Sequence, residues 1–512
     1  MLHFSWIDYT VFAGYLLLTL AIGGLFFREK SNLSEYFLAQ RSMNSLIVAM
    51  TILASLFSGI SFLAAPSEGY ANGLAFFIVN FSFFIATPIT TLIFLPFFYK
   101  RHFFTAYQYL EERFSVQIRT LASASFIVRV LFWLGSATYA PALALEAVTG
   151  LPLWFTIVCT GLLTTFYTTL GGMKAVIWTD VMQLVVLFGG QLIIALTALG
   201  HIPGGVGKVI DMAQASGRLS VSTSIDPTVR LTIWGMLIGA AFMNLVQMAT
   251  DQVSVQRYLT AKSIQEARRG LWIKLGLVLP VTFVFYGTGL VLYAFYQVHG
   301  DPLASGQITK ADQILPFYVV TQLPAGFPGL FIAAIYAASM STVSAGLNSL
   351  TSASLVDFYQ RLSRNPNPDE NVQLRIARYL TLLYGLFVIG LAFVVPYIGT
   401  LLEATNTIIS LVGGPLLGLF FLGILVRRAT ARGAMVGWIV GMAALVPICL
   451  VNKISFLWFA MIGCLITMAV GYLASLFEPA PPLEKLKGLT WSLRPTDADS
   501  EVVQAEPASS LN

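Results

Sequence analysis

Two clusters of small and hydroxyl-bearing residues interrupt otherwise apolar stretches of the chain. The first lies in IVAMTILASLFSGISFLAAPSEGYANG and comprises Ser55, Ser58, Gly59 and Ser61. The second lies in AAIYAASMSTVSAGLNSL and comprises Ser339, Ser341, Thr342 and Ser344. One interpretation is that small residues let neighbouring helices approach closely. The other is that an unwound helix frees backbone carbonyls, which join hydroxyls of the second cluster around a hard cation such as Na⁺. Two such clusters in one chain favour the cation site.

The elements that position these clusters are predicted to be membrane-spanning helices. Hydrophobic residues make up 57% of the 512 residues and charged residues 10%, against about 45–50% and about 25% in soluble domains. Apolar runs of about 20 residues recur along the chain, and each can cross a hydrocarbon core as a helix. Because lipid offers the backbone no hydrogen-bond partners, such runs form helices and not open sheets. The sequence therefore predicts an all-α polytopic membrane protein.

The apolar runs predict about 13 transmembrane helices. Their ranges are 6–27, 46–72, 73–99, 118–148, 151–170, 174–200, 229–252, 270–298, 326–352, 374–396, 401–425, 430–452 and 454–476. The first run has no basic flank before it and no small-residue cleavage site after it, so we expect an anchoring span and not a signal peptide. The three cysteines lie singly in apolar runs and predict neither a disulfide framework nor a metal site.

The distribution of Lys and Arg predicts the orientation of these helices. With the N-terminus outside, 23 of the 29 basic residues, Lys274 among them, fall in inner loops and the C-terminal tail, and five fall outside. This is a strong positive-inside signal. The net charge of +5 therefore reflects topology and does not predict nucleic-acid binding. We expect a multi-pass protein of the inner or plasma (cell) membrane, with its N-terminus outside and its C-terminus cytoplasmic.

Six motifs occur in order along the chain: SEYFLAQRSM, TAYQYLEERF, YAPALALEAVTG, TTLGGMKAVIWTDVMQ, QRYLTAKS and MSTVSAGLNS. Together they resemble the sodium:solute symporter family over about residues 6–450. The resemblance is closest to the branch of iodide, multivitamin and monocarboxylate symporters, and the layout is also similar to bacterial sialic acid symporters. It implies a LeuT-like core of two inverted five-helix repeats.

The resemblance and the composition together divide the chain into six units. They are a first helix with a cytoplasmic loop (1–45), repeat one (46–200), an external loop (201–228), repeat two (229–425), two C-terminal helices (426–476) and a tail (477–512). The tail is polar and Pro-rich, so we expect it to be disordered and cytoplasmic.

The resemblance implies which atoms hold sodium. The principal site would use the backbone carbonyls of Ala54, Phe57 and Ala338 and the hydroxyls of Ser341 and Thr342. Five neutral oxygens around a monovalent cation need no carboxylate.

A possible second sodium site would use Asp180, Ser341 and Ser344. The sequence departs from the sialic acid symporters here, because Ala345 stands where they carry another Ser. The alternative for Asp180 is a carboxylate at the inner end of a helix that is satisfied by Lys174 or a neighbouring Arg.

The family geometry places the solute beside the break in the second span, facing spans 3, 4 and 7. The candidate contacts are side chains within those spans: Ser58, Ser61, Phe76, Asn80, Arg129, Trp133, Asn244 and Gln247. Polar side chains inside a membrane are costly unless they serve a function, yet hydrogen bonds between helices account for many of them.

Arg129 is the one basic residue that the charge count assigns to neither side, because it lies well inside a predicted span. Its guanidinium suits a carboxylate clamp, and it lies one turn before Trp133, the position at which sialic acid symporters carry a carboxylate-binding Arg. The alternative is a structural ion pair or a side chain that snorkels to the inner surface.

These observations predict a sodium-coupled secondary symporter that imports a small organic solute by alternating access. A carboxylate-bearing solute, either a monocarboxylate or a sialic-acid-like one, is favoured over a neutral sugar. Na⁺ is the coupling ion, and we expect no cofactor, nucleic acid or obligate protein partner. An enzyme is not expected, because the four histidines lie at loops or helix ends and no HExxH or phosphate loop occurs. A channel would show rings of charge. A non-transporting solute sensor or a sodium-leak homologue stays open.

Overall fold

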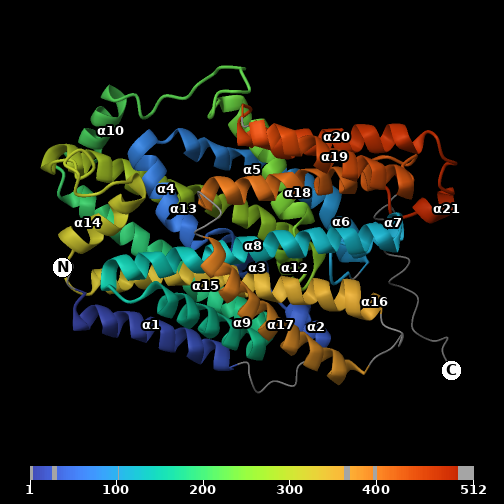
Figure 1. The fold of residues 1–512 in the computed structure, drawn as a ribbon, viewed down its shortest axis with the longest axis horizontal. Coiled ribbons are helices and arrows are strands. Elements are labelled where there is room, and N and C mark those ends of the chain that lie inside the picture. Colours follow the sequence, from blue (N-terminus) through green and yellow to red (C-terminus); the bar gives the residue numbers. More distant parts are fainter. Residues whose placement is uncertain are drawn as a thin grey trace.

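The computed structural model is a bundle of helices (Figure 1). It describes residues 4–25, 32–101, 103–362, 369–395, 401–451 and 453–493. Within these ranges there is no β-strand, and extended backbone pairs only in two isolated bridges, Met43 with Ala261 and Ser222 with Thr232. The prediction of an all-α protein is confirmed for the described residues.

Nine helical segments of the described chain are long and apolar enough to cross a membrane. They are α1 (Trp6–Leu25), Ala75–Lys100, α8 (Val116–Thr149), α9 (Leu153–Gly200), α13 (Ile264–His299), Phe327–Leu362, α17 (Glu370–Val394), α19 (Ala431–Val451) and Phe456–Ser475. A further span is a pair of helices, α3 (Ser45–Leu56) and α4 (Gly59–Asn72), bent by 73° at the break between them. Two shorter apolar segments are Gly235–Thr250 and Ser410–Leu425, the second within α18 (Leu401–Leu425).

Several of these segments depart from regular α-helix. Ala75–Lys100 comprises η2 (Ala75–Ser82), α5 (Phe83–Ile89), η3 (Thr90–Phe94) and α6 (Leu95–Lys100). Gly235–Thr250 comprises η4 (Gly235–Gly239), α11 (Ala240–Leu245) and η5 (Val246–Thr250), and α12 (Gln252–Tyr258) follows it. Phe327–Leu362 comprises α15 (Phe327–Ala353), η7 (Ser354–Tyr359) and α16 (Gln360–Leu362). The segment η2 is 3₁₀-helical, whereas η3, η4, η5 and η7 are π-helical.

The remaining elements are short. They are α2 (Leu33–Leu38), η1 (Ala39–Arg41), α7 (Gln108–Arg113), α10 (Gly205–Ala215), η6 (Ala311–Gln313), α14 (Ile314–Gln322), η9 (Phe456–Trp458), α20 (Phe459–Ser475), α21 (Leu483–Leu486) and η10 (Trp491–Leu493).

Helix α9 contains two of the predicted spans, 151–170 and 174–200. Its 48 residues would extend about 72 Å at about 1.5 Å per residue, roughly twice the hydrocarbon thickness. Gly172 interrupts the helix with φ 55° and ψ −156°, a conformation that side-chain-bearing residues rarely adopt. The total of 13 spans and the inverted repeat stay predictions.

Helix α15 is the buried centre of the bundle, and it lies among other helices in Figure 1. Every residue from Phe331 to Ala353 is buried, and α15 packs against α1, α3, α4, α8, α9 and α17. Its many Ala, Ser and Gly residues let these helices approach closely. The second hydroxyl cluster therefore faces protein and not lipid.

Residues 477–493 fold back onto the bundle, so the expected disorder from residue 477 is wrong for this part of the tail. Leu486, Leu489 and Thr490 are buried, and the Tyr109 hydroxyl donates a hydrogen bond to the Leu489 carbonyl at 2.8 Å. Composition could not predict this, because the few apolar residues of the segment find their partners only on the folded bundle. Residues 494–512 lie outside the described residues.

Helices α4 and α13 cross in direct backbone contact. A Cβ added at Gly289 would lie 2.0 Å from the Pro66 carbonyl oxygen, and one at Gly69 would lie 2.2 Å from the Tyr286 carbonyl oxygen. Since both neighbours are backbone atoms, neither can move aside without separating the helices. Glycines at the crossing therefore let α4, the second half of the broken span, lie directly against α13.

We expect Gly289→Ala to destabilise the protein, because the added methyl meets the backbone of α4. Overpacking of this kind costs about 1–3 kcal/mol. Thermal unfolding in detergent measures the effect. The matched control is Gly287→Ala on the same helix, where nothing lies within 4 Å of the added Cβ. Equal melting temperatures for the two variants would contradict the close crossing.

Candidate functional site

The break between α3 and α4 exposes backbone oxygens inside the bundle. Phe57 has extended dihedrals, φ −91° and ψ 101°, and Ser58 caps the start of α4 by accepting a hydrogen bond from the Ser61 amide at 3.3 Å. Because the last carbonyls of a helix have no partner within it, the end of α3 needs donors from another element.

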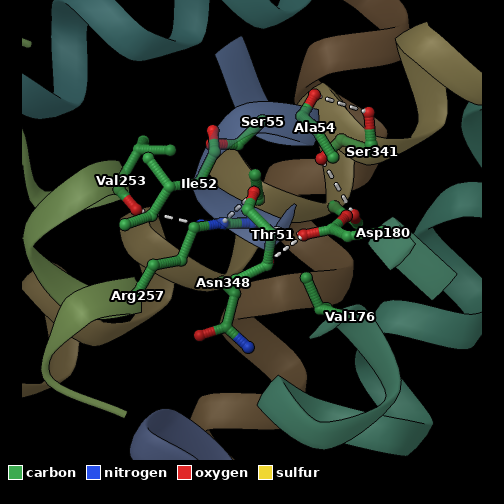
Figure 2. Close-up of polar contacts among 12 residues, drawn as sticks. Thr51, Ile52, Ala54, Ser55, Val176, Asp180, Val253, Arg257, Ser341 and Asn348 are labelled. Atoms are coloured by element: carbon green, nitrogen blue, oxygen red, sulfur yellow. Dashed lines mark hydrogen bonds and ion pairs between the residues drawn. The ribbon is translucent and has the colours of Figure 1, made fainter. Parts of the chain in front are cut away.

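Those donors are the two hydroxyls predicted for the principal sodium site. The Ser341 hydroxyl donates to the Ala54 carbonyl at 3.1 Å and to the Ala338 carbonyl at 3.0 Å. The Thr342 hydroxyl lies 3.4 Å from the Phe57 carbonyl oxygen and 3.0 Å from that of Ala338. All five residues are buried, and Figure 2 shows Ser341 meeting the end of α3 at Ala54. The structure therefore brings the five predicted residues together, and their binding of Na⁺ stays a prediction.

Gly59 allows the break to lie this close to α15. A Cβ at Gly59 would be 2.3 Å from the Ser339 hydroxyl oxygen, so a larger residue would push the start of α4 away. Within the described residues the Ser339 hydroxyl has no hydrogen-bond partner. The small residues thus allow the close helix packing of the first interpretation, and the cation site of the second stays a prediction.

Asp180 lies in α9 and is paired with an arginine, which is one of the two partners that the sequence offered for it as the alternative to a sodium role. Its Oδ2 accepts from the Thr51 hydroxyl at 2.5 Å and from Arg257 Nη2 at 3.1 Å (Figure 2). Lys174 instead pairs with Glu35 at 2.6 Å. The side chains of Asp180 and Arg257 are completely buried, so this pair lies in the protein interior and not at a solvent-exposed helix end.

Two of the three residues of the possible second sodium site, Ser341 and Ser344, contact each other within α15, and the third, Asp180, belongs to α9. Asp180 Oδ1 has no hydrogen-bond partner among the described residues, and the Ser344 hydroxyl donates to the Ser341 carbonyl at 3.1 Å. The sequence analysis did not single out Thr51 of α3, and Arg257 of α12 lies in the motif QRYLTAKS without being named there as the partner of Asp180. Whether Asp180, Ser341 and Ser344 hold an ion stays a prediction.

Arg257 ties several elements to this region. Its guanidinium donates to the Thr51 carbonyl of α3 at 3.2 Å and to the Val253 carbonyl of its own helix at 2.9 Å. With the ion pair to Asp180, one side chain therefore joins α3, α9 and α12.

The predicted solute contacts fall into separate groups. Ser58 and Ser61 face each other across the start of α4, with hydroxyl oxygens 3.4 Å apart. Asn244 donates to the Ser82 hydroxyl at 2.7 Å, which joins α11 to the end of η2. Ser82 was not among the predicted residues.

The remaining solute-contact candidates, Phe76, Asn80, Trp133 and Gln247, have no hydrogen bond to another candidate among the described residues. Asn80 donates to the Phe77 carbonyl of its own segment at 2.9 Å. The Phe76 ring lies 6.1 Å from that of Tyr286 and 6.3 Å from that of Phe456. Trp133 and Gln247 are half-buried. A role for any of these residues in solute binding stays a prediction.

Arg129 forms the structural ion pair that was the alternative to a carboxylate clamp. Its Nη2 lies 2.6 Å from Asp251 Oδ2, and both side chains are buried. Asp251 lies between η5 and α12 with φ −83° and ψ 119°, and its other oxygen accepts from the Val253 amide at 3.0 Å. The chain therefore has a second extended break, and Arg129 is directed at it.

We expect Arg129→Gln to lower stability strongly, because it leaves the Asp251 carboxylate buried without its cation. Breaking one partner of a buried pair costs about 3–5 kcal/mol. The double variant Arg129→Gln/Asp251→Asn should recover much of the loss in melting temperature. A single variant as stable as the parent protein would contradict a structural role for the pair.

Comparisons with known proteins agree with this architecture. Residues 36–441 match the family described as the Sodium:solute symporter family. The chain is 35% identical to the sodium-dependent multivitamin transporter of Oryctolagus cuniculus, over 99% of this chain and 77% of that one. It is 36% identical to sodium-coupled monocarboxylate transporter 1 of Homo sapiens, over 85% of this chain and 72% of that one.

A solved structure supports the same assignment. The substrate-bound, outward-open state of a Na⁺-coupled sialic acid symporter matches with a TM-score of 0.86 and 31% sequence identity, covering 94% of this chain and 100% of that one. The match of the family to most of the chain, the identities and the shared fold establish that this chain belongs to the Sodium:solute symporter family and is a sodium-coupled symporter.

Proposed function

We propose that the chain imports a small organic anion together with Na⁺ across the cell membrane, by alternating access. One observation carries the sodium part of this proposal. The carbonyls of Ala54 and Phe57, freed at the helix break, meet the Ser341 and Thr342 hydroxyls of α15. A cluster of neutral oxygens at a broken helix suits a monovalent cation.

Na⁺ would link the broken span to α15. The two hydroxyls now donate protons to the carbonyls, so they would have to rotate and present lone pairs to the ion. The ion then replaces a set of hydrogen bonds with stronger ion–dipole contacts between the same elements. Each Na⁺ that moves down a membrane potential of about 100 mV contributes about 2.3 kcal/mol. This free energy would drive solute import when Na⁺ and solute are bound together.

The proposed solute class rests on the relatives and on charge. The similar proteins are named for multivitamins, monocarboxylates and sialic acid, and small acids occur in each of these groups. The solute would bind beside the break, near Ser58, Ser61 and the Asn244–Ser82 hydrogen bond. We propose a carboxylate-bearing solute, with a neutral sugar as the other outcome of the test below.

Two further features belong to the proposal. Asp180 with Ser341 and Ser344 would hold a second Na⁺, which predicts two ions per solute. The positive-inside pattern places the N-terminus outside and the C-terminus in the cytoplasm.

We expect Thr342→Val to raise the Na⁺ concentration for half-maximal uptake about tenfold or more, or to abolish uptake, because it removes one ligand oxygen while preserving shape. Hydrogen bonds to charged groups contribute about 1.5–3 kcal/mol, and an oxygen–Na⁺ contact should be at least comparable. Uptake into proteoliposomes is measured against Na⁺ concentration.

The matched control for this experiment is Thr342→Ser, which keeps the hydroxyl and should keep sodium dependence close to that of the parent protein. If Thr342→Val is well folded and requires no more Na⁺ than the parent protein, Thr342 is not a sodium ligand.

We expect Na⁺-dependent uptake of at least one small acid and not of its neutral amide. The panel contains lactate, pyruvate, nicotinate, biotin and N-acetylneuraminate, the corresponding amides where they exist, and glucose. Proteoliposomes are assayed with Na⁺ and with choline, and the ratio of Na⁺ to solute flux distinguishes one ion from two. If glucose is taken up and none of the acids is, the neutral-sugar alternative replaces the acid. Na⁺ flux that does not depend on solute would indicate a sodium leak.

A further inference from the structure

Lys274 lies in the first half of α13 and is completely buried. The charge count groups it with the basic residues of the inner loops, and the fold places its side chain between the start of α5 and η5. Its ammonium lies 3.2 Å from the centre of the Phe83 ring and 3.8 Å from the Met248 sulfur. A thioether is a weak acceptor, and an ammonium group has three protons to donate.

Other large buried cations of the bundle are better satisfied. Arg257 pairs with Asp180, and Arg129 pairs with Asp251. Arg113, which has no carboxylate partner among the described residues, donates to three backbone carbonyls, those of Gly423, Val426 and Ala429. Lys274 has neither a carboxylate nor an oxygen acceptor within hydrogen-bonding distance in the described part of the chain. Burying such a charge is unfavourable unless a partner arrives.

The surroundings of Lys274 are continuous with the proposed solute region. Phe83 directly follows Ser82, which accepts the hydrogen bond from Asn244. Met248 directly follows Gln247 and lies one turn after Asn244. The ammonium is therefore covered by the same two segments that the Asn244–Ser82 hydrogen bond joins.

Those covering segments are suited to movement. Phe83 begins α5 immediately after the 3₁₀-helical η2, and Met248 lies in the π-helical η5. Single π turns are frequent at functional sites, and a Met side chain readily adopts other rotamers. The lysine stem is itself flexible, so a modest displacement of Phe83 and Met248 would open the ammonium toward the Asn244–Ser82 hydrogen bond.

We propose that Lys274 is the residue that recognises the charge of the solute, by pairing its ammonium with the solute carboxylate. This inference rests on the proposed function and names the residue that selects an acid over a neutral molecule. Arg129 is unsuited to that role because Asp251 already neutralises it. A lysine is a compact point charge without the fork geometry of arginine, so it selects for charge and tolerates acids of different shape.

The test compares Lys274→Met with Lys274→Arg and the parent protein. The control is Lys262→Gln, which removes a positive charge from an exposed position nearby in sequence. Each is assayed for uptake of the panel acid that the parent protein carries best. Melting temperature with and without Na⁺ is measured on the same samples.

We expect Lys274→Met to lose uptake of the acid at least tenfold, and Lys274→Arg to retain part of it. Lys274→Met should melt at or above the temperature of the parent protein, because an apolar side chain in an apolar site removes an uncompensated charge. Its stabilisation by Na⁺ should be unchanged, since Lys274 takes no part in the sodium cluster. Lys262→Gln should behave as the parent protein.

Two results would overturn the inference alone. One is full uptake of the acid by Lys274→Met. The other is a lower melting temperature with lost Na⁺ stabilisation, which would make Lys274 structural. If the parent protein itself takes up no panel acid with Na⁺, the proposed function fails, and this inference fails with it.

Discussion

A helix that breaks inside a bilayer must have its freed backbone groups satisfied by other parts of the protein, and this constraint organises the structure. Lipid offers no hydrogen-bond partner, so irregular backbone is tolerated only where protein or a polar cavity surrounds it. The break after Leu56 meets that requirement through α15, whose hydroxyls reach the Ala54 and Phe57 carbonyls. This in turn explains why α15 is buried on every side and rich in small residues.

The second extended break, at Asp251, is satisfied by charge instead of by hydroxyls. Its dihedrals, φ −83° and ψ 119°, are close to those of Phe57, φ −91° and ψ 101°. One carboxylate oxygen caps α12, and the other binds Arg129. Arg257, just beyond this break, reaches back to Thr51 just before the first one. One buried guanidinium therefore connects the segments that flank the two breaks.

The interior charges differ in whether the protein itself neutralises them, and the proposed solute class rests on that difference. Arg129 and Arg257 are neutralised by protein carboxylates, so neither offers a free charge to a solute in this conformation. Lys274 differs from these arginines, because among the described residues its buried ammonium contacts an aromatic ring and a thioether and no carboxylate, and we propose that the solute supplies the missing negative charge. Selectivity for acids would then arise from one unpaired charge, and shape selectivity from the surrounding helices.

The sequence, with the family resemblance that its motifs carry, determined the helical membrane fold and the five residues of the predicted sodium site. Apolar runs of membrane length can only form helices in lipid, and the hydroxyl clusters around Ser58 and Ser341 marked the two elements that meet. The five residues implied by the resemblance indeed converge. These features depend on local composition and on short motifs, which a sequence carries directly.

The tertiary structure alone decided which charges pair and which do not. Arg129 and Asp251 are 122 residues apart, Asp180 and Arg257 are 77 apart, and Tyr109 and Leu489 are 380 apart. Charge counting could not show that Lys274 is buried, and composition predicted disorder for residues 477–493, which instead pack against the bundle. Burial of a side chain depends on the surfaces that fold over it, and those surfaces come from distant segments whose approach no local pattern records.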